Sequence, residues 1–583
     1  MNVERDGSVD LEELSVLVVD CQATGANPQQ GSIIEIGWAR ADGQNDTGCR
    51  LRVETRVLEL PPDIQIPARV QRVTGISPGD ITAGQDPLEV WREILSIAAV
   101  IAQENGMEKC PAIVHFAKFE IPFLLDLHAR VSSGAGFPLS AVCTHEISRR
   151  LFPDLPRRSM RAMAGYFGRP LANFRRCHEH VEATAFIWRE SVRILQRRHD
   201  IRTIEDLWQW LAQPWKGAGQ TRVYPMPEEA RAGLPDQPGV YRMLSARGDV
   251  LYIGKANSLR QRVKSYFRKG SRHAEHILEM LSQARQLEVT ATGSALEASI
   301  LESDEIKRHN PPYNRVLRRD GRSVWFASPD LVSFSEMPGA GHTVGPLASL
   351  DAVQGLAAIK QIMQTGSLGE ADMELAIAGL GMPVDQAPEI QVIVAGYAAF
   401  LDRHKTRLRS ATPERFLFEL GRELWILRRM EAATNVEEPA QFELKSVTVR
   451  SMTPDAVCSI IEANIARGTH EIRMARWLLL LAESAIGWEE HDGQRMKRFI
   501  IVLEKGQVLY RRDNSADELP VPPGHRSTLK ARQRVFDLMT LDRLRVITTE
   551  IRKMVQSGRR VELRLGPGHE VDCGGLKKIF TGI

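Results

Sequence analysis

The stretch GVYRMLSARGDVLYIGKANSLRQRVKSYF occupies residues 239–267, and the rest of the chain is best interpreted around it. It opens with two short pieces, 239–241 and 252–255, in which β-branched or aromatic residues alternate with others. A turn-forming segment at 246–249 separates the two pieces, so together they predict a β-hairpin. Apolar residues at helical spacing then predict a helix over residues 257–267.

The predicted helix and its flanks form a strongly basic segment. Between residues 255 and 272 the chain has seven basic residues and no acidic one. The aromatic residues Tyr266 and Phe267 lie among them, and this combination favours nucleic acid over a small phosphate ligand. The basic side chains that we expect to contact DNA are Arg260, Lys264, Arg268 and Lys269.

A second helical pattern at residues 297–307 is followed by Asn310-Pro-Pro-Tyr-Asn314. With Gly-Val-Tyr241, Tyr252-Ile-Gly and the two helices, this order of elements resembles the GIY-YIG nuclease domain. The resemblance is closest to the version in the UvrC excision-repair subunit and its short homologue Cho. Taken singly, a hairpin tyrosine is usually a packing residue and a helical glutamate usually faces solvent. Only the joint spacing of the elements favours a nuclease.

The resemblance implies a site that hydrolyses a phosphodiester bond. The implied catalytic residues are Tyr241, Tyr252, Lys255, Arg262, Tyr266 and Glu302, and Asn314 is added to the expected DNA contacts. Glu302 would hold one hard divalent ion, Mg²⁺ or Mn²⁺. Arg262 would pair with the scissile phosphate as a planar fork. Either Tyr241 or Tyr252 would activate water, with Lys255 lowering the pKa of the phenol.

Length and composition bound the other possibilities. A chain of 583 residues is too long for one hydrophobic core. The net charge is only +3, so we expect DNA affinity to come from local basic patches. The longest apolar run, at 477–482, is too short to cross a bilayer, and the first residues lack the pattern of a signal peptide. The seven cysteines include no Cys-x-x-Cys pair, which argues against a zinc site. We therefore expect a cytoplasmic protein without a membrane partner.

Upstream of the basic segment, predicted strands alternate with a helix. Residues 14–20, 32–39 and 112–115 predict buried strands, and residues 87–104 predict a helix. This alternation is typical of an α/β domain with a mixed sheet. The order over about residues 10–195 resembles the DnaQ-like proofreading exonucleases of the DEDD type, which have the ribonuclease H-like fold.

The catalytic pattern of that exonuclease family is incomplete in this chain. The resemblance implies two metal ions held by four acids, with a histidine as base. The corresponding residues here are Asp20, Gln22, Glu120, Arg175 and His180. An amide, a guanidinium and an imidazole do not supply the charge that two cations require. Glu179 or Glu182 could replace a lost acid, but each faces a different side of the helix from His180. We therefore expect an inactive domain kept for binding or scaffolding.

These patterns predict a multidomain α/β protein. The expected parts are an exonuclease-fold domain at 1–195, a linker at 196–231, a GIY-YIG domain at 232–318, a mainly helical region at 319–440 and an α/β region at 441–583. Near the end, the basic residues between 543 and 560 form either a second basic face or a solvated helix. We find no paired helix-hairpin-helix motif, no second nuclease motif and no coiled-coil segment of the kind that docks on UvrB.

The sequence thus favours a metal-dependent DNA endonuclease, with DNA as its partner and a role in repair. Two alternatives remain open at this point. The first is a dual nuclease whose N-terminal domain still trims 3′ ends. The second is a DNA-binding scaffold without catalysis. Gln22, Arg175 and His180 argue against the first alternative, and the intact tyrosine, arginine and glutamate set argues against the second.

Overall fold

A computed structural model describes residues 9–582 of the chain with interruptions. The interruptions are at residues 42–50, 62–63, 133, 135, 170–173, 216, 218–221, 269, 319–320, 366–367, 369–371, 383–386, 435–451, 493–494, 514–517, 525, 527, 535 and 566–568. Lys269, which we expected to contact DNA, lies outside the described residues. No helix among the residues described is long and apolar enough to cross a membrane.

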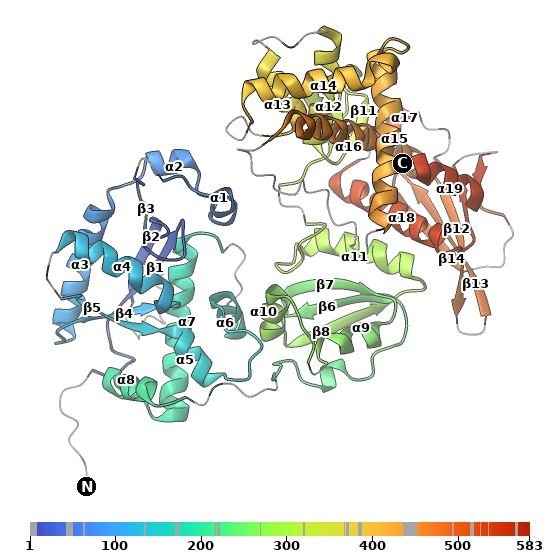
Figure 1. Ribbon diagram of the computed structural model, residues 1–583. Coiled ribbons are helices and arrows are strands. Elements are labelled where there is room, and N and C mark those ends of the chain that lie inside the picture. Colours follow the sequence, from blue (N-terminus) through green and yellow to red (C-terminus); the bar gives the residue numbers. More distant parts are fainter. Residues whose placement is uncertain are drawn as a thin grey trace. The chain divides into compact units, whose positions relative to one another are not determined.

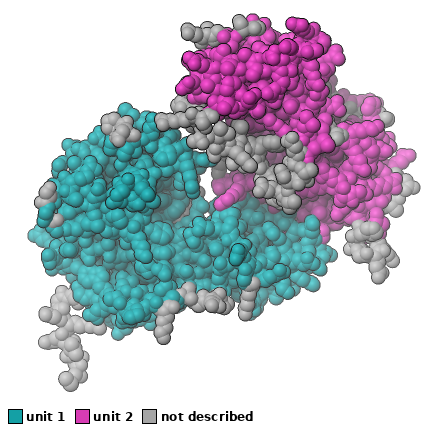
Figure 2. Space-filling view, viewed as in Figure 1, with its two compact units in different colours: residues 1–237, 241–290, 311–314 teal, residues 238–240, 291–310, 315–583 magenta. Residues whose placement is uncertain are grey.

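The chain divides into two compact units (Figure 2). The first comprises residues 1–237, 241–290 and 311–314, and the second comprises residues 238–240, 291–310 and 315–583. The boundary passes through the segment expected to be the GIY-YIG domain. Its hairpin and basic helix belong to the first unit, whereas the helix that carries Glu302 belongs to the second.

The first unit begins with a mixed five-stranded sheet of order β3-β2-β1-β4-β5 (Figure 1). Its strands are β1 (Val16–Ala23), β2 (Ile33–Ala41), β3 (Glu54–Val57), β4 (Cys110–Val114) and β5 (Leu139–Cys143). Strand β1 pairs antiparallel with β2 and parallel with β4. Since successive side chains of a strand point to opposite faces, Leu17 and Val19 enter one core while Val16 and Val18 enter another. Apolar cores on both faces explain why β1 is an uninterrupted hydrophobic run.

Helices cover both faces of this sheet. They are α1 (Ala68–Thr74), α2 (Pro78–Thr82), α3 (Pro87–Glu104), α4 (Ala117–Val131), α5 (Thr144–Leu151), α6 (Met160–Tyr166), α7 (Cys177–His199) and α8 (Ile204–Ala212). Trp91 of α3 and Phe123 of α4 fill the first core, and Trp188 of α7 fills the second. This arrangement confirms the expected α/β exonuclease fold.

Helix α8 changes the expected boundary of this domain. Its residues Ile204 and Leu207 are buried in the second core, and Thr203 caps the helix by accepting a hydrogen bond from the Asp206 amide. The interval 196–231, expected to be a linker, therefore begins with structure that belongs to the exonuclease fold. The sequence hid this because α8 is only nine residues long.

The rest of the first unit contains the hairpin and its basic helix. Strands β6 (Gly239–Leu244), β7 (Val250–Ala256) and β8 (Gln286–Ala291) form a sheet of order β7-β6-β8. Helices α9 (Leu259–Tyr266) and α10 (Glu275–Gln283) accompany it, and a 3-10 turn at Glu229–Arg231 precedes it. Ser258 caps α9 by accepting from the Gln261 amide, which fixes the start of the basic helix.

Helix α6 of the exonuclease fold packs on α10 within the same unit. Ser159 Oγ donates to Glu279 Oε1 at 2.5 Å, and the Arg157 amide donates to Ser282 Oγ at 2.9 Å. A side chain at Gly165 would overlap Gln283, so the glycine permits this close approach. The two folds of the first unit therefore share a packed and hydrogen-bonded interface.

The second unit has a helical part and an α/β part. The helical part contains α12 (Leu350–Thr365), α13 (Met373–Leu380), α14 (Ile390–Leu408), α15 (Pro413–Thr434) and α16 (Pro454–Leu481), with a small sheet of β9 (Trp325–Ala327), β10 (Phe334–Ser335) and β11 (Val344–Leu347). Most of the core-forming side chains of α16 lie in the same hydrophobic core as α12 and α14. The helical part therefore extends past residue 440, where we expected it to end. The strand expected at 442–449 lies outside the described residues.

The α/β part is a five-stranded sheet of order β14-β13-β12-β15-β16. Its elements are β12 (Ala485–Asp492), β13 (Arg495–Glu504), β14 (Gln507–Asp513), β15 (Val561–Arg564), β16 (Glu570–Val571), α17 (Leu529–Gln533), α18 (Leu538–Gln556) and α19 (Cys573–Gly582). Helix α11 (Ala295–His309) joins this part, because its Leu296 and Ile300 are buried in the same core as Leu541 and Leu544 of α18.

Two basic residues of α18, Arg543 and Arg545, pair with acids of other helices. Arg543 is buried and forms an ion pair with Asp304 of α11 at 3.0 Å. Arg545 pairs with Glu471 at 3.3 Å. Of the two alternatives left open for the basic residues between 543 and 560, an exposed basic face does not fit Arg543 and Arg545, because acids distant in sequence neutralise them.

Candidate active sites

Three of the predicted catalytic side chains meet in the first unit. Tyr241 of β6 and Tyr266 of α9 share a hydrogen bond of 2.7 Å between their hydroxyl oxygens. Arg262 lies one turn before Tyr266 on the same face of α9. Its Nε donates to Tyr241 Oη and its Nη2 to Tyr266 Oη, both at 3.3 Å. The ring of Tyr252 on β7 lies 6.1 Å from that of Tyr241, centroid to centroid. We call these four residues the tyrosine–arginine cluster.

The glycine of the Tyr252-Ile-Gly motif has a local reason in this cluster. A Cβ built on Gly254 would overlap the hydroxyl and ring of Tyr241. Only a residue without a side chain therefore lets the Tyr241 ring lie across β7. The glycine of this motif thus reflects a packing requirement as well as chemistry.

The cluster holds its two tyrosines in different environments. Tyr241 is fully buried, whereas Tyr252 is half-buried. Burial, and then the neighbouring phenols Tyr266 and Tyr252, raise the pKa of Tyr241 well above its usual range. Burial alone would lower the pKa of Arg262, but Tyr241 and Tyr266 raise it. Tyr241 is therefore a neutral hydroxyl and Arg262 a permanent cation at neutral pH.

Asn314 differs from its expected role as a DNA contact. Its Oδ1 accepts from the Ile253 amide at 2.9 Å and its Nδ2 donates to the Ile253 carbonyl at 2.8 Å. The side chain is buried. Because both ends of the amide bind the backbone of β7, we correct the expectation: Asn314 fixes the strand that carries Tyr252.

The remaining basic residues expected to bind DNA lie at or near the surface. Arg260 and Lys264 of α9 and Arg268 just beyond it are exposed. Arg260 Nε also donates to the Leu234 carbonyl at 2.9 Å. Lys255 on β7 is half-buried. Lys264 of the helix and Arg268 just beyond it are therefore open to solvent.

Glu302 is described with the second unit. It is half-buried on α11, a helix capped by Ser294, whose hydroxyl accepts from the Glu297 amide. Ion pairs from the same helix to α18 join Asp304 to Arg543 and Lys307 to Asp542. These contacts fix the helix that carries the predicted metal ligand.

The residues expected at the degenerate exonuclease site also come together. Asp20 lies in the buried part of β1, Glu120 on α4 and His180 on α7, and both carboxylates are buried. His180 Nδ1 lies 3.1 Å from Asp20 Oδ2. Gln22 Nε2 donates to the Arg175 carbonyl at 2.6 Å. The Arg175 side chain is exposed, so its backbone rather than its guanidinium contacts this site.

The electrostatics of this site oppose cation binding. Burial alone would lower the pKa of His180, but the Asp20 carboxylate raises it above its ordinary value. Burial, and then Asp20, raise the pKa of Glu120 well above its usual range, and within the described part of the chain the buried Glu120 Oε2 has no hydrogen-bond partner. One carboxylate thus lies against the His180 imidazole, whose protonated form it favours, and the other favours its own neutral form. Among the residues described, no group of three or more His, Cys, Asp or Glu side chains could hold a metal ion.

Both possible substitute acids have other partners. Glu179 Oε2 accepts from the Arg176 amide at 3.1 Å, and Glu182 pairs with Arg169 at 2.6 Å. Sequence reasoning missed a third acid, Glu35 of β2, which is almost fully buried. Glu35 accepts from the Arg176 side chain at 2.8 Å and from the Cys177 amide at 2.9 Å, and so holds the N-terminus of α7. A lone acid within the apolar run 33–36 was the available signal.

Comparison with known proteins supports both folds. Residues 237–315 match the family model of the UvrC-like GIY-YIG domain, and residues 17–178 match that of an exonuclease. These matches confirm the resemblance inferred from the motifs.

Individual relatives match only a small part of the chain. The UvrABC system protein C of Sphingopyxis alaskensis is 45% identical over 128 residues, which are 21% of this chain and 20% of that protein. That of Desulforudis audaxviator is 49% identical over 94 residues, 16% of this chain and 15% of that protein. The chain thus spans about a fifth or less of the length of these relatives. A solved structure, the GIY-YIG N-terminal endonuclease domain of UvrC from Thermotoga maritima bound to magnesium, is 34% identical, covers 15% of this chain and 99% of that chain, and has a TM-score of 0.14.

Proposed function

Since residues 237–315 match the UvrC-like GIY-YIG domain, we propose that this chain is a DNA endonuclease that hydrolyses one phosphodiester bond with the help of a divalent cation. The observation that carries the proposal is the tyrosine–arginine cluster, in which a permanent cation is held by two tyrosine hydroxyls. Relatives named UvrABC system protein C suggest a role in nucleotide excision repair. DNA is the proposed substrate.

Arg262 is proposed to bind the scissile phosphate. A guanidinium presents a planar set of donors that matches two phosphate oxygens. The hydroxyls of Tyr241 and Tyr266 hold this group on one side of α9, so little ordering is needed when DNA binds. Charge that develops on the phosphate would then meet a cation already in place.

Tyr252 is the better candidate for the residue that accepts a proton from water. It is half-buried, whereas Tyr241 is fully buried and its pKa is raised by burial. A buried phenol with a raised pKa is a poor base. We therefore assign Tyr241 and Tyr266 to holding Arg262.

Glu302 is proposed to hold the cation, Mg²⁺ or Mn²⁺. A single half-buried carboxylate fits Mg²⁺, which commonly keeps most of its waters when one carboxylate binds it. The ion would stabilise charge on the phosphate and lower the pKa of a bound water. The relative from Thermotoga maritima has magnesium as its catalytic cation.

The exonuclease-fold domain is proposed to act without catalysis. Its acids are neutralised by His180 and by burial, and its helix α6 packs on α10 of the neighbouring fold. It would thus support the endonuclease fold. The match of residues 17–178 to an exonuclease family model favours a second, exonucleolytic activity, and the pairing of His180 with Asp20 argues against it.

Two assays on the full chain test this function together. Supercoiled plasmid is incubated with the protein and Mg²⁺, Mn²⁺ or a chelator, while a 3′-labelled single-stranded oligonucleotide is followed in parallel. We expect metal-dependent conversion of supercoiled to open-circular plasmid, and no release of mononucleotides. Release of mononucleotides would support the dual nuclease, and DNA binding without either product would support the scaffold.

A further inference from the structure

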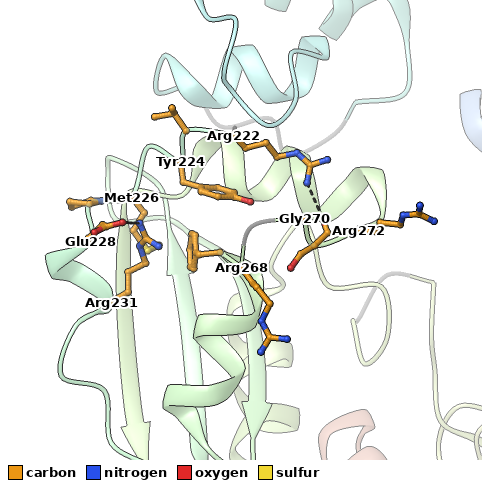
Figure 3. A pocket seen from close by; sticks show the side chains of 12 residues that line it. Arg222, Tyr224, Met226, Glu228, Arg231, Arg268, Gly270 and Arg272 are labelled. Carbon is orange, nitrogen blue, oxygen red and sulfur yellow. Dashed lines mark hydrogen bonds and ion pairs between the residues drawn. The ribbon is translucent and has the colours of Figure 1, made fainter. Parts of the chain in front are cut away.

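A basic and aromatic pocket lies beside the tyrosine–arginine cluster and shares no residue with it. The cavity has a volume of about 580 Å³, within the usual range for small-ligand sites. One wall comes from the segment 222–231, which precedes β6, and the other from residues 267–268 and 270–272, which follow α9 (Figure 3). Both walls belong to the first unit.

Four arginines and one acid line this pocket. Arg222, Arg268 and Arg272 lie to one side of Tyr224, and Arg231 lies to the other with Glu228 (Figure 3). The only acid in the lining, Glu228, pairs with Arg231 at 3.6 Å and is mostly exposed. An excess of guanidinium groups around a cavity favours an anionic ligand.

The arginines retain donors for such a ligand. Arg222 Nη1 donates to the Ser271 carbonyl at 3.0 Å. The side chain is exposed, so its other nitrogens can donate to a ligand. Arg231 Nε is buried and has no hydrogen-bond partner among the described residues. A buried donor without a partner costs free energy unless a ligand or water satisfies it.

Two aromatic rings make the pocket more than a phosphate site. Tyr224 and Phe267 pack in a T-shaped arrangement, with ring centroids 5.0 Å apart. The guanidinium carbon of Arg231 lies 4.1 Å from the Phe267 centroid and so covers one face of that ring. Tyr224 is only half-buried. Its ring is therefore the surface on which a planar ligand can stack.

The wall that carries Tyr224 is held in place before any ligand binds. The Val223 amide donates to the Asp154 carbonyl of the exonuclease fold at 2.8 Å. Met226, two residues after Tyr224, is buried in the core that contains Val263 and Tyr266 of α9. A fixed wall reduces the ordering cost of binding.

We propose that this pocket binds an unpaired nucleotide of a DNA strand, with the base on Tyr224 and the flanking phosphates on Arg268 and Arg272. The proposal rests on the proposed function for its choice of DNA. A simple polyphosphate would not stack on the aromatic rings, whereas a nucleotide would bind the arginines through its phosphates and the rings through its base. The exposed Lys264 of α9 and Arg268 are four residues apart, so the backbone of a bound strand can pass from the helix to the pocket.

The test measures binding in a chelator, so that no cutting takes place. The full chain is titrated into a fluorescent ten-nucleotide thymidine strand and into a blunt duplex of the same length. Tyr224→Ala should weaken binding of the single strand about tenfold or more and that of the duplex much less, because only the unpaired base can stack. Tyr224→Phe should keep the wild-type affinity. Equal single-strand affinity of wild type and Tyr224→Ala would overturn the proposal.

A second variant tests the charges independently of Tyr224. Arg268→Gln combined with Arg272→Gln should reduce the slope of log affinity against log salt by about 1.4, or 0.7 for each lost phosphate contact. The matched control, Arg69→Gln with Arg72→Gln on α1, removes the same charge from exposed positions of the same unit. Equal slopes for the two double variants would overturn the proposal that the arginines of this pocket bind phosphates.

The source of the nucleotide is distinguished by competition with thymidine monophosphate. If thymidine monophosphate displaces the labelled strand only at millimolar concentration, the pocket binds a nucleotide within a strand. If it displaces the labelled strand as efficiently as the unlabelled strand does, the proposal is overturned in favour of a free nucleotide. Because no step requires cleavage, a protein that binds through this pocket but does not nick plasmid would refute the proposed function alone.

Discussion

The two nuclease-like sites of the first unit differ in the kind of charge they keep. At the exonuclease-fold site, buried carboxylates remain, but His180 pairs with Asp20 and burial raises the pKa of Glu120. At the tyrosine–arginine cluster, the hydroxyls of Tyr241 and Tyr266 accept hydrogen bonds from one cation, Arg262. A site for two metal ions requires strong negative charge, whereas a phosphate site requires a cation with available donors. The charges at the exonuclease-fold site fit the first requirement poorly, whereas the cluster fits the second.

The comparison teaches that the exonuclease fold does not depend on the charges at its site. The exonuclease fold is stabilised by apolar cores on both faces of β1, and these do not depend on the acids at the end of that strand. Replacement of an acid by His180 adds a partner for Asp20 in place of a repulsive neighbour. A change that abolishes metal binding can thus be neutral or favourable for stability.

The largest expected effect concerns the cation of the endonuclease. Glu302→Ala should reduce plasmid nicking roughly 1,000-fold, equivalent to about 4 kcal/mol of transition-state stabilisation. DNA affinity should change little, because binding rests on the basic residues of α9 and its flanks. Rates are measured from supercoiled plasmid and affinities by fluorescence anisotropy in a chelator. Glu288→Ala, at an exposed position of β8, is the matched control. Normal nicking by Glu302→Ala would refute the assignment of the metal ligand.

The next effect separates a catalytic cation from a binding cation on the same helix. Arg262→Gln should lower kcat about 100-fold and leave KM within a few-fold, because a group directed at one phosphate acts mainly in the transition state. Lys264→Gln should instead raise KM and leave kcat nearly unchanged. Steady-state rates of duplex nicking give kcat and KM for each variant and so distinguish the two effects. Identical kinetic defects would mean that Arg262 contributes only to binding.

A third experiment attempts to restore the lost charge. Gln22→Glu combined with His180→Asp, in a Glu302→Ala background, removes a cation and adds two carboxylates beside Asp20 and Glu120. We expect 1 mM Mn²⁺ to raise the Tm by about 3 °C, as for an ion that binds only the folded state. His180→Asn alone should show no such rise. A similar rise in the Glu302→Ala protein without these changes would show that the exonuclease-fold site already binds metal.

The sequence predicted the elements better than the long-range contacts. Periodicity placed the helix at 87–104, where α3 runs, because its apolar stripe is regular. It could not show that the Asn314 amide binds the backbone of Ile253, 61 residues away, or that Arg543 pairs with Asp304, 239 residues away. Spacing reveals which side chains share a face of one element. It does not reveal which groups distant in the sequence form hydrogen bonds with these side chains.

The candidate sites show the same limit. Motif spacing selected Tyr241, Arg262 and Tyr266, which the structure brings together. It gave no indication of the pocket at Tyr224, because this wall lies in the interval that looked like a linker. Glu302 stays a prediction based on its motif.

The smallest expected effect is a pH dependence of stability at the exonuclease-fold site. The pKa of His180 is raised in the folded protein by Asp20, although burial opposes this, and Glu179 and Glu35 add smaller contributions in the same direction. A raised pKa means that the folded state binds the proton more tightly than the unfolded state. The stabilisation is therefore complete below the ordinary histidine pKa of about 6.5 and is lost as the pH rises through the folded value. Partly buried ion pairs contribute on the order of 1 kcal/mol, or about 2–4 °C in Tm. We expect the Tm difference between wild type and His180→Asn to shrink by that amount between pH 6 and pH 9, measured by differential scanning fluorimetry. A difference that is constant with pH would mean that His180 is neutral beside Asp20, and that the loss of metal binding must then be attributed to Gln22 and to the raised pKa of Glu120.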